Sequence, residues 1–227
     1  MKTSKIALYA YFLCCIIAII ADIFRLDGVS LFTIPLVIPA LFFYYYTETK
    51  KISVLICIFL MSNFIGDFLG LMDFENELYY VIPPFFISNL IMVIIMIKNI
   101  EKFKFNIFNI FSLTIIGLFL TYILSLFLDL FSIEEITIQI QVAVFGILLI
   151  ILALLASYNI IWKMNIANLF LMMCASCVLI SDVFYLVYNY QNQLQVLDCI
   201  HFSCQLFSYF FFIKYMLLRE SSASIRS

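Results

Sequence analysis

The chain has 227 residues, of which 66% are hydrophobic and 11% are charged, and its formal net charge is −2. A soluble domain typically carries about 25% charged residues, so this composition excludes a soluble globular protein, and no basic patch suggests a nucleic-acid partner. Apolar runs long enough to cross a hydrocarbon layer of ~30 Å recur along the whole chain. The sequence therefore predicts an all-α, polytopic membrane helix bundle that forms a single domain over residues 1–227.

Eight apolar segments follow one another with short connections, so sequence neighbours are expected to be antiparallel neighbours in space. The first segment has a basic start, like a signal peptide, but it is long and lacks a cleavage site, so we expect it to be retained. The second is short and contains Pro35 and Pro39, which predict a kink whose freed carbonyl groups are satisfied inside the bundle. The predicted spans are 5–24, 31–46, 51–71, 79–97, 107–128, 137–156, 165–187 and 197–217.

Basic residues fall on one side of this alternating path. Of the 12 Lys and Arg residues, all but Arg25 lie at the termini or in the connections after the second, fourth and sixth spans. They are Lys2, Lys5, Lys50, Lys51, Lys98, Lys102, Lys104, Lys163, Lys214, Arg219 and Arg226. The positive-inside rule therefore predicts that both termini are cytoplasmic, as in a multi-pass protein of a bacterial cytoplasmic membrane. The opposite side carries Asp27, Asp73, Glu75, Glu77, Glu134 and Glu135.

Cysteine and histidine usage limits the possible chemistry. Cys174 and Cys177 have a redox-like spacing, but inside a membrane span this spacing predicts helix packing, and a disulfide between Cys199 and Cys204 is conceivable without further support. With His201 as the only histidine, a bis-histidine haem and a multi-histidine metal site are excluded. The usual motifs of serine and metal-dependent hydrolases do not occur. We expect neither a metal nor a cofactor.

Carboxylates inside the predicted spans are the strongest functional signal. Ionisable groups in the membrane are costly and mark functional sites by default. Asp67 and Asp182 lie four and five residues from the outer ends of their spans, which predicts equal depth toward the non-cytoplasmic side. Asp22, Asp129 and Asp198 are close enough to water to be plain interfacial residues.

Other polar residues extend this predicted site. Asn63 shares the helix face of Asp67, and the Gly66–Gly70 pair lets another helix approach closely. Further polar residues are Tyr185, Asn89 in the fourth span, Thr121, Ser125 and Asp129 in the fifth, and the stripe Asp198, His201, Gln205 and Ser208 in the last. A lone Asn, Gln or His is more often a packing residue, but their recurrence on several helices predicts a water-accessible cavity open to the non-cytoplasmic side or the outer leaflet.

Two carboxylates that share a low-dielectric site do not both ionise easily, so the pair offers an acid and a negative charge together. This combination suits reactions that pass through an oxocarbenium ion, as in glycoside hydrolysis. It also suits proton-coupled transport. A third alternative is a noncatalytic scaffold, in which the two aspartates point away from each other. The residues alone leave these alternatives open.

Several short motifs, in this order along the chain, resemble the YhhN family of eight-span lysoplasmalogenase-like membrane proteins. They are "MSNFIGDFLGLM" (61–72), "CVLISDVFYLVYNY" (177–190) and "HFSCQLF" (201–207), and "FTIPLVIPALFFYYY" (32–46) resembles the family's second span. The resemblance covers essentially the whole chain. The chain departs from the family pattern at Ile34, Asn89 and His201, where the family commonly has Lys, His and Tyr. These departures suggest either a different lipid substrate or no hydrolase activity.

The resemblance implies a hydrolase that cleaves the vinyl-ether, or a related ether, bond of a lysophospholipid and releases a fatty aldehyde. By this resemblance Asp67 and Asp182 would be the acid/base pair, with Asn63 and Gln205 positioning water or substrate. Further predicted substrate-binding residues are Asn89, Tyr185 and His201. The expected partner is a lysophospholipid or another membrane lipid. The alternative function is a small proton-coupled transporter or a noncatalytic lipid-handling protein.

Overall fold

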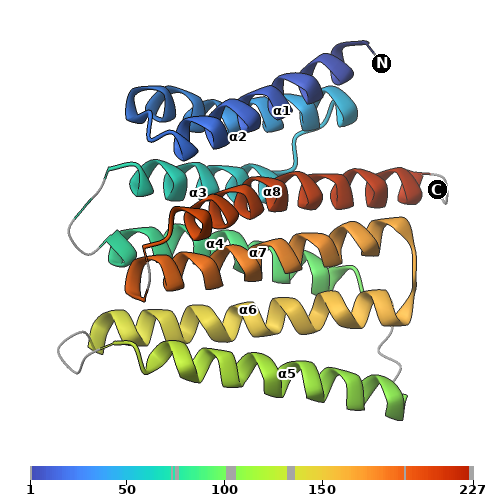
Figure 1. The fold of residues 1–227 in the computed structure, drawn as a ribbon. Coiled ribbons are helices and arrows are strands. Elements are labelled where there is room, and N and C mark those ends of the chain that lie inside the picture. The colour runs from blue at the N-terminus through green and yellow to red at the C-terminus, as the bar shows by residue number, and fades with distance from the viewer. Residues whose placement is uncertain are drawn as a thin grey trace.

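The computed structural model describes residues 2–72, 74, 77–100, 106–131, 136–191 and 193–224, and every regular element in these ranges is an α-helix (Figure 1). In chain order the helices are α1 (Lys2–Ile23), α2 (Asp27–Thr49), α3 (Val54–Gly70), α4 (Glu77–Lys98), α5 (Ile107–Leu128), α6 (Ile136–Trp162), α7 (Ile166–Tyr190) and α8 (Gln195–Ser224). Seven of these described helices are long and apolar enough to cross a membrane, while α3, with 17 residues, is shorter. The prediction of an all-α, polytopic bundle with eight helices is confirmed.

Most helices are longer than the predicted apolar spans, but α5 has the predicted bounds and α3 is shorter than its predicted span. The predicted sixth span stops at residue 156, whereas α6 continues to Trp162 because its polar residues find partners inside the helix. Asn159 Nδ2, for example, donates to the carbonyl of Leu155 at 2.8 Å. Helix α2 stays helical through both Pro35 and Pro39. Polar residues end an apolar run in the sequence, but the helix continues when those polar groups have hydrogen-bond partners.

The helices stack in successive layers, which Figure 1 shows as α1 with α2, then α3 with α8, then α4 with α7, and finally α6 and α5. The closest partners are α7 with α8, α1 with α2, and α3 with α4. Helix α5 lies at the edge, where it packs on α6 and none of its residues is buried. Gly146 of α6 accommodates this contact, because the side chain of Leu124 occupies the place where a Cβ atom would stand.

Buried aromatic side chains join the central helices. Phe59 of α3 packs on Phe212 of α8 with ring centroids 4.5 Å apart. Tyr11 of α1 is fully buried and donates its hydroxyl to the carbonyl of Leu206 in α8 at 2.5 Å. Since lipid tails are as apolar as the side chains, such close packing and interhelical hydrogen bonds hold the bundle together.

All seven cysteines are free thiols, including Cys199 and Cys204. Cys174 is fully buried in the core and its Sγ contacts Met92 Sδ of α4 at 3.7 Å. The prediction that Cys174 serves helix packing is confirmed.

Both chain ends lie at the same end of the bundle (Figure 1). The even-numbered connections share that end, so the described basic residues there include Lys50, Lys51, Lys98 and Lys163. The alternation of basic and acidic ends is thus confirmed for the described residues, and the cytoplasmic location of the basic end stays a prediction. Lys102, Lys104, Arg226, Asp73, Glu75, Glu134 and Glu135 lie outside the described residues.

Asn168 ties the end of α6 to the start of α7, and its loss is expected to destabilise the bundle. Its buried amide donates to the carbonyls of Asn159 and Lys163, each at 2.9 Å. Asn168→Ala leaves both carbonyls without this donor and should lower the free energy of unfolding by about 1–3 kcal/mol. The measurement is denaturant unfolding of the purified protein. Asn189→Ala is the control, because that exposed amide only donates to Tyr185 of its own helix. Equal stability of the two variants would contradict the expectation.

Candidate functional site

A large cavity opens between the helices at the end of the bundle opposite the termini. Its volume is about 760 Å³, and all eight helices contribute to its lining. Near its mouth lie the charged side chains of Asp22, Arg25, Glu77 and Asp198. Its inner part is largely apolar and includes Phe59, Met92, Leu149 and Ile150. The predicted cavity is therefore present, and a volume of this size is typical of a site for a small amphiphilic ligand.

Asp67 is held in place by α8. Its Oδ1 accepts hydrogen bonds from Gln205 Nε2 at 2.7 Å and from the Tyr209 hydroxyl at 2.8 Å. Gln205 Nε2 also lies 2.8 Å from the Tyr209 hydroxyl, which closes a triangle of three polar groups. Asp67 Oδ2 is buried and has no hydrogen-bond partner among the described residues. One carboxylate oxygen is thus fixed by two donors, while the other is enclosed by the protein without a hydrogen-bond partner among the described residues.

Gly66 permits the close packing that places this part of α3 against α4. A Cβ atom at Gly66 would stand only 2.7 Å from the ring of Phe85 in α4. At Gly70, the nearest atom to a Cβ would be Glu77 Oε1, at 3.4 Å. The predicted close approach of another helix at this glycine pair is confirmed, and α4 is that helix.

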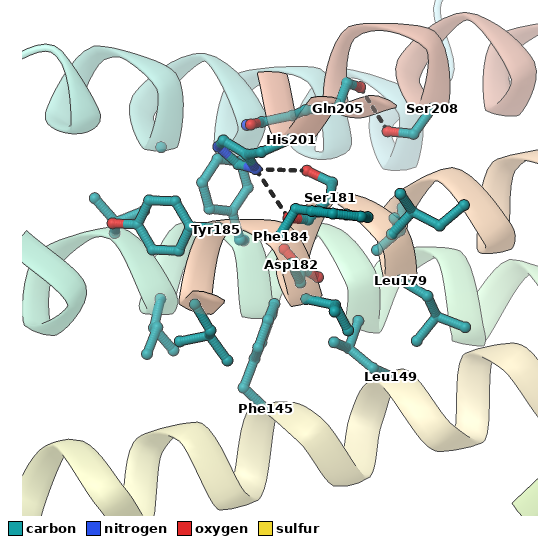
Figure 2. A pocket seen from close by; sticks show the side chains of 18 of the residues that line it. Phe145, Leu149, Leu179, Ser181, Asp182, Phe184, Tyr185, His201, Gln205 and Ser208 are labelled. Atoms are coloured by element: carbon teal, nitrogen blue, oxygen red, sulfur yellow. Dashed lines mark hydrogen bonds between the residues drawn. The ribbon is translucent and has the colours of Figure 1, made fainter. Parts of the chain in front are cut away.

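Asp182 lies on a different side of the cavity. Figure 2 shows its carboxyl group on the face of α7 that points toward Phe145 and Leu149 of α6. Its Oδ2 is buried, and no described residue donates a hydrogen bond to that oxygen. Asp182 therefore combines an apolar setting with an unused oxygen, which is the environment of a carboxyl group that serves as an acid.

The two aspartates lie beside different residues of α8. Ser181, which precedes Asp182, contacts His201 of α8, whereas Asp67 contacts Gln205 and Tyr209. That both carboxyl groups lie at equal depth stays a prediction. The two carboxyl groups thus line one cavity without a hydrogen bond between them.

Two asparagines reach the cavity from α3 and α4. Asn63 Nδ2 donates to Ser88 Oγ at 2.7 Å and to the carbonyl of Phe59 at 2.9 Å. Asn89 is only 5% exposed and lines the cavity. A side-chain amide in such a place can bind a ligand or an ordered water.

The polar stripe of α8 reaches the cavity as predicted, since Asp198, His201, Gln205 and Ser208 all line it. Tyr185 of α7 lines it too and packs against His201, with ring centroids 4.9 Å apart. The polar stripe predicted for the fifth span is wrong. Thr121 and Ser125 are exposed and bond to carbonyls of their own helix, at Gly117 and Tyr122, because α5 is an edge helix.

The cavity residues that the sequence prediction missed include Tyr209, Ser181 and Ser88. Tyr209 follows Gln205 by four residues and so continues the stripe of α8 on the same face. Because tyrosine counts as hydrophobic in a membrane span, the sequence pattern does not single this residue out. Ser181 and Ser88 each stand beside a predicted site residue, but single serines in membrane helices carry little signal.

The cavity offers carboxylates, amides, hydroxyls and one imidazole as polar groups. Among the described residues, no group of three His, Cys, Asp or Glu side chains is placed to hold a metal ion. No protein-family model, curated protein or solved structure matches this chain, so the roles of its residues are argued from the geometry of the cavity.

Proposed function

We propose that this protein is a membrane hydrolase that cleaves the vinyl-ether bond of a lysophospholipid at the non-cytoplasmic side. The observation that carries the proposal is that Asp67 and Asp182 line one cavity and that each has an enclosed carboxylate oxygen without a hydrogen-bond partner among the described residues. Unpartnered buried carboxylate oxygens are costly, and intramembrane carboxylates are retained for function. The order of the motifs that resemble the YhhN family supports the same reading.

The polarity of the cavity fits a lipid with one chain. A polar headgroup would lie at the charged mouth, where the Arg25 guanidinium can accompany a phosphate. The hydrocarbon chain would extend toward the apolar residues Phe59, Met92 and Leu149. The linkage between headgroup and chain would then lie near the two aspartates.

The two carboxyl groups take different roles in this proposal. Asp182, which lies among apolar side chains, gives its proton to the vinyl carbon and forms an oxocarbenium ion. Asp67 is oriented by Gln205 and Tyr209 and stabilises the positive charge as a carboxylate. Water then adds to the cationic carbon, and the hemiacetal collapses to a fatty aldehyde and a glycerophospholipid headgroup.

The proposal is tested by incubating the purified protein, in nanodiscs, with a lysoplasmalogen and measuring the released aldehyde. The matched control substrate has the same headgroup and chain length but a saturated ether, which cannot be protonated to an oxocarbenium ion. We expect aldehyde from the vinyl ether alone. Proton-driven solute flux in proteoliposomes, with no aldehyde from either lipid, would contradict the proposal and favour a transporter.

A further inference from the structure

His201 makes an unusual pair of contacts with a single residue of α7. Its Nδ1 lies 2.9 Å from Ser181 Oγ and 3.0 Å from the backbone carbonyl oxygen of the same residue, as the dashed lines in Figure 2 show. Ser181 is itself buried, with 2% of its surface exposed. The imidazole is therefore anchored through one nitrogen to a rigid helix.

The carbonyl contact determines which nitrogen carries the proton. A hydroxyl can donate or accept, but a backbone carbonyl oxygen can only accept. If Nδ1 were unprotonated, its lone pair would face the carbonyl oxygen of Ser181 at 3.0 Å, which is repulsive. The neutral imidazole therefore has Nδ1–H donating to Ser181, and Nε2 carries the lone pair.

Nε2 is open to the cavity. His201 belongs to the cavity lining, and no described residue makes a hydrogen bond to Nε2. Because His201 lines the cavity and its Nδ1 is turned to Ser181, Nε2 is the ring nitrogen that is available to a ligand there. The ionisable groups around the imidazole are Asp182 next to Ser181, Tyr185 packed on the ring, and Asp198 one turn earlier on α8.

We propose that His201 is the base of the reaction and that Ser181 positions it by fixing the proton on Nδ1. This role rests on the proposed hydrolase function. Asp67 is less suited to it, because one of its oxygens already accepts from Gln205 and Tyr209 and the other is enclosed by the protein. His201 instead is held through one ring nitrogen by Ser181, the residue that precedes Asp182.

The proton transfers balance over one turnover. Asp182 gives its proton to the vinyl carbon, and the attacking water gives a proton to Nε2 of His201. When the hemiacetal collapses, the imidazolium returns that proton to the glycerol oxygen as its bond to carbon breaks. The carboxylate of Asp182 takes the proton of the hemiacetal hydroxyl, so both residues end in their starting state and one water is consumed.

The first test uses the fact that the chain contains a single histidine. Protein labelled with ¹⁵N-histidine, reconstituted in nanodiscs at neutral pH, gives one pair of imidazole nitrogen resonances. We expect a protonated Nδ1 and an unprotonated Nε2, and we expect the Nε2 resonance to shift when a non-cleavable lysolipid ether fills the cavity. A proton on Nε2, or no shift on lipid addition, would overturn the inference whether or not the protein is active.

The second test measures aldehyde release by His201→Ala and His201→Gln. Both variants should lose at least about 100-fold in kcat, and added imidazole should restore part of the activity to the alanine variant only, since glutamine leaves no space for it. A merely structural role would give no rescue. If the wild type is active and His201→Ala matches it, the inference fails and the proposed function stands. If the wild type is inactive, the proposed function fails, while the resonances still decide the tautomer and the open nitrogen.

Discussion

Asp182→Asn is expected to lower the rate of aldehyde release by about 100- to 10,000-fold, the range that general acid catalysis contributes. The amide keeps the size of the side chain but cannot give a proton to the vinyl carbon. Asp182 Oδ2 has no hydrogen-bond partner among the described residues, so the substitution removes no internal bond at that oxygen. The loss should therefore appear in kcat, with the stability of the protein unchanged. Steady-state kinetics and thermal unfolding of the purified variant measure the two quantities.

Asp129→Asn is the matched control for this experiment. Asp129 is the exposed C-cap residue of the edge helix α5 and does not line the cavity. The same change of carboxylate to amide should leave both activity and stability at the wild-type level there. A fully active Asp182→Asn would exclude this carboxyl group as the acid.

Asp67→Asn is expected to reduce kcat by about 100- to 1,000-fold, as the loss of one preorganised electrostatic group does in other enzymes. The asparagine oxygen can still accept from Gln205 and Tyr209, so the triangle with α8 can persist. The negative charge that stabilises the oxocarbenium ion is lost. Because that ion exists only near the transition state, KM should change little.

Tyr209→Phe separates the charge of Asp67 from its orientation. This variant removes one of the two donors to Oδ1 and leaves the carboxylate in place. We expect a smaller loss of about tenfold, the equivalent of one net hydrogen bond. If Asp67→Asn raised KM and left kcat unchanged, Asp67 would only bind substrate, and its assigned role in the transition state would be wrong.

The helical architecture was predictable because seven of the eight described helices are long and apolar enough to form a span on their own. The ends of the helices were less predictable, since groups such as the Asn159 amide are satisfied locally and allow α6 to continue. The place of α5 at the edge could not be read from its sequence either. When a helix is apolar on all sides, its sequence does not show which face packs on the bundle. The prediction that Thr121 and Ser125 face the bundle interior was therefore wrong.

The sequence predicts which residues line the candidate site, but it does not predict the contacts that these residues make. Carboxylates in membrane spans stand out by their cost, and Asp67, Asp182 and the α8 stripe do line one cavity. The partners of each carboxyl group depend on how neighbouring helices pack, which a residue count does not contain. The fixed tautomer of His201 depends on one backbone carbonyl of α7, and no sequence motif encodes such a contact.

The most direct test of the proposed chemistry is aldehyde release in deuterated water. Protonation of the vinyl carbon by Asp182 predicts one deuterium on the carbon next to the aldehyde group, detected by mass spectrometry after rapid trapping of the product. The signal should appear with the wild-type protein and be lost in both Asp67→Asn and Asp182→Asn. Equal labelled aldehyde from wild type and both variants, or none from the wild type, would contradict the assignment of a hydrolase to this cavity.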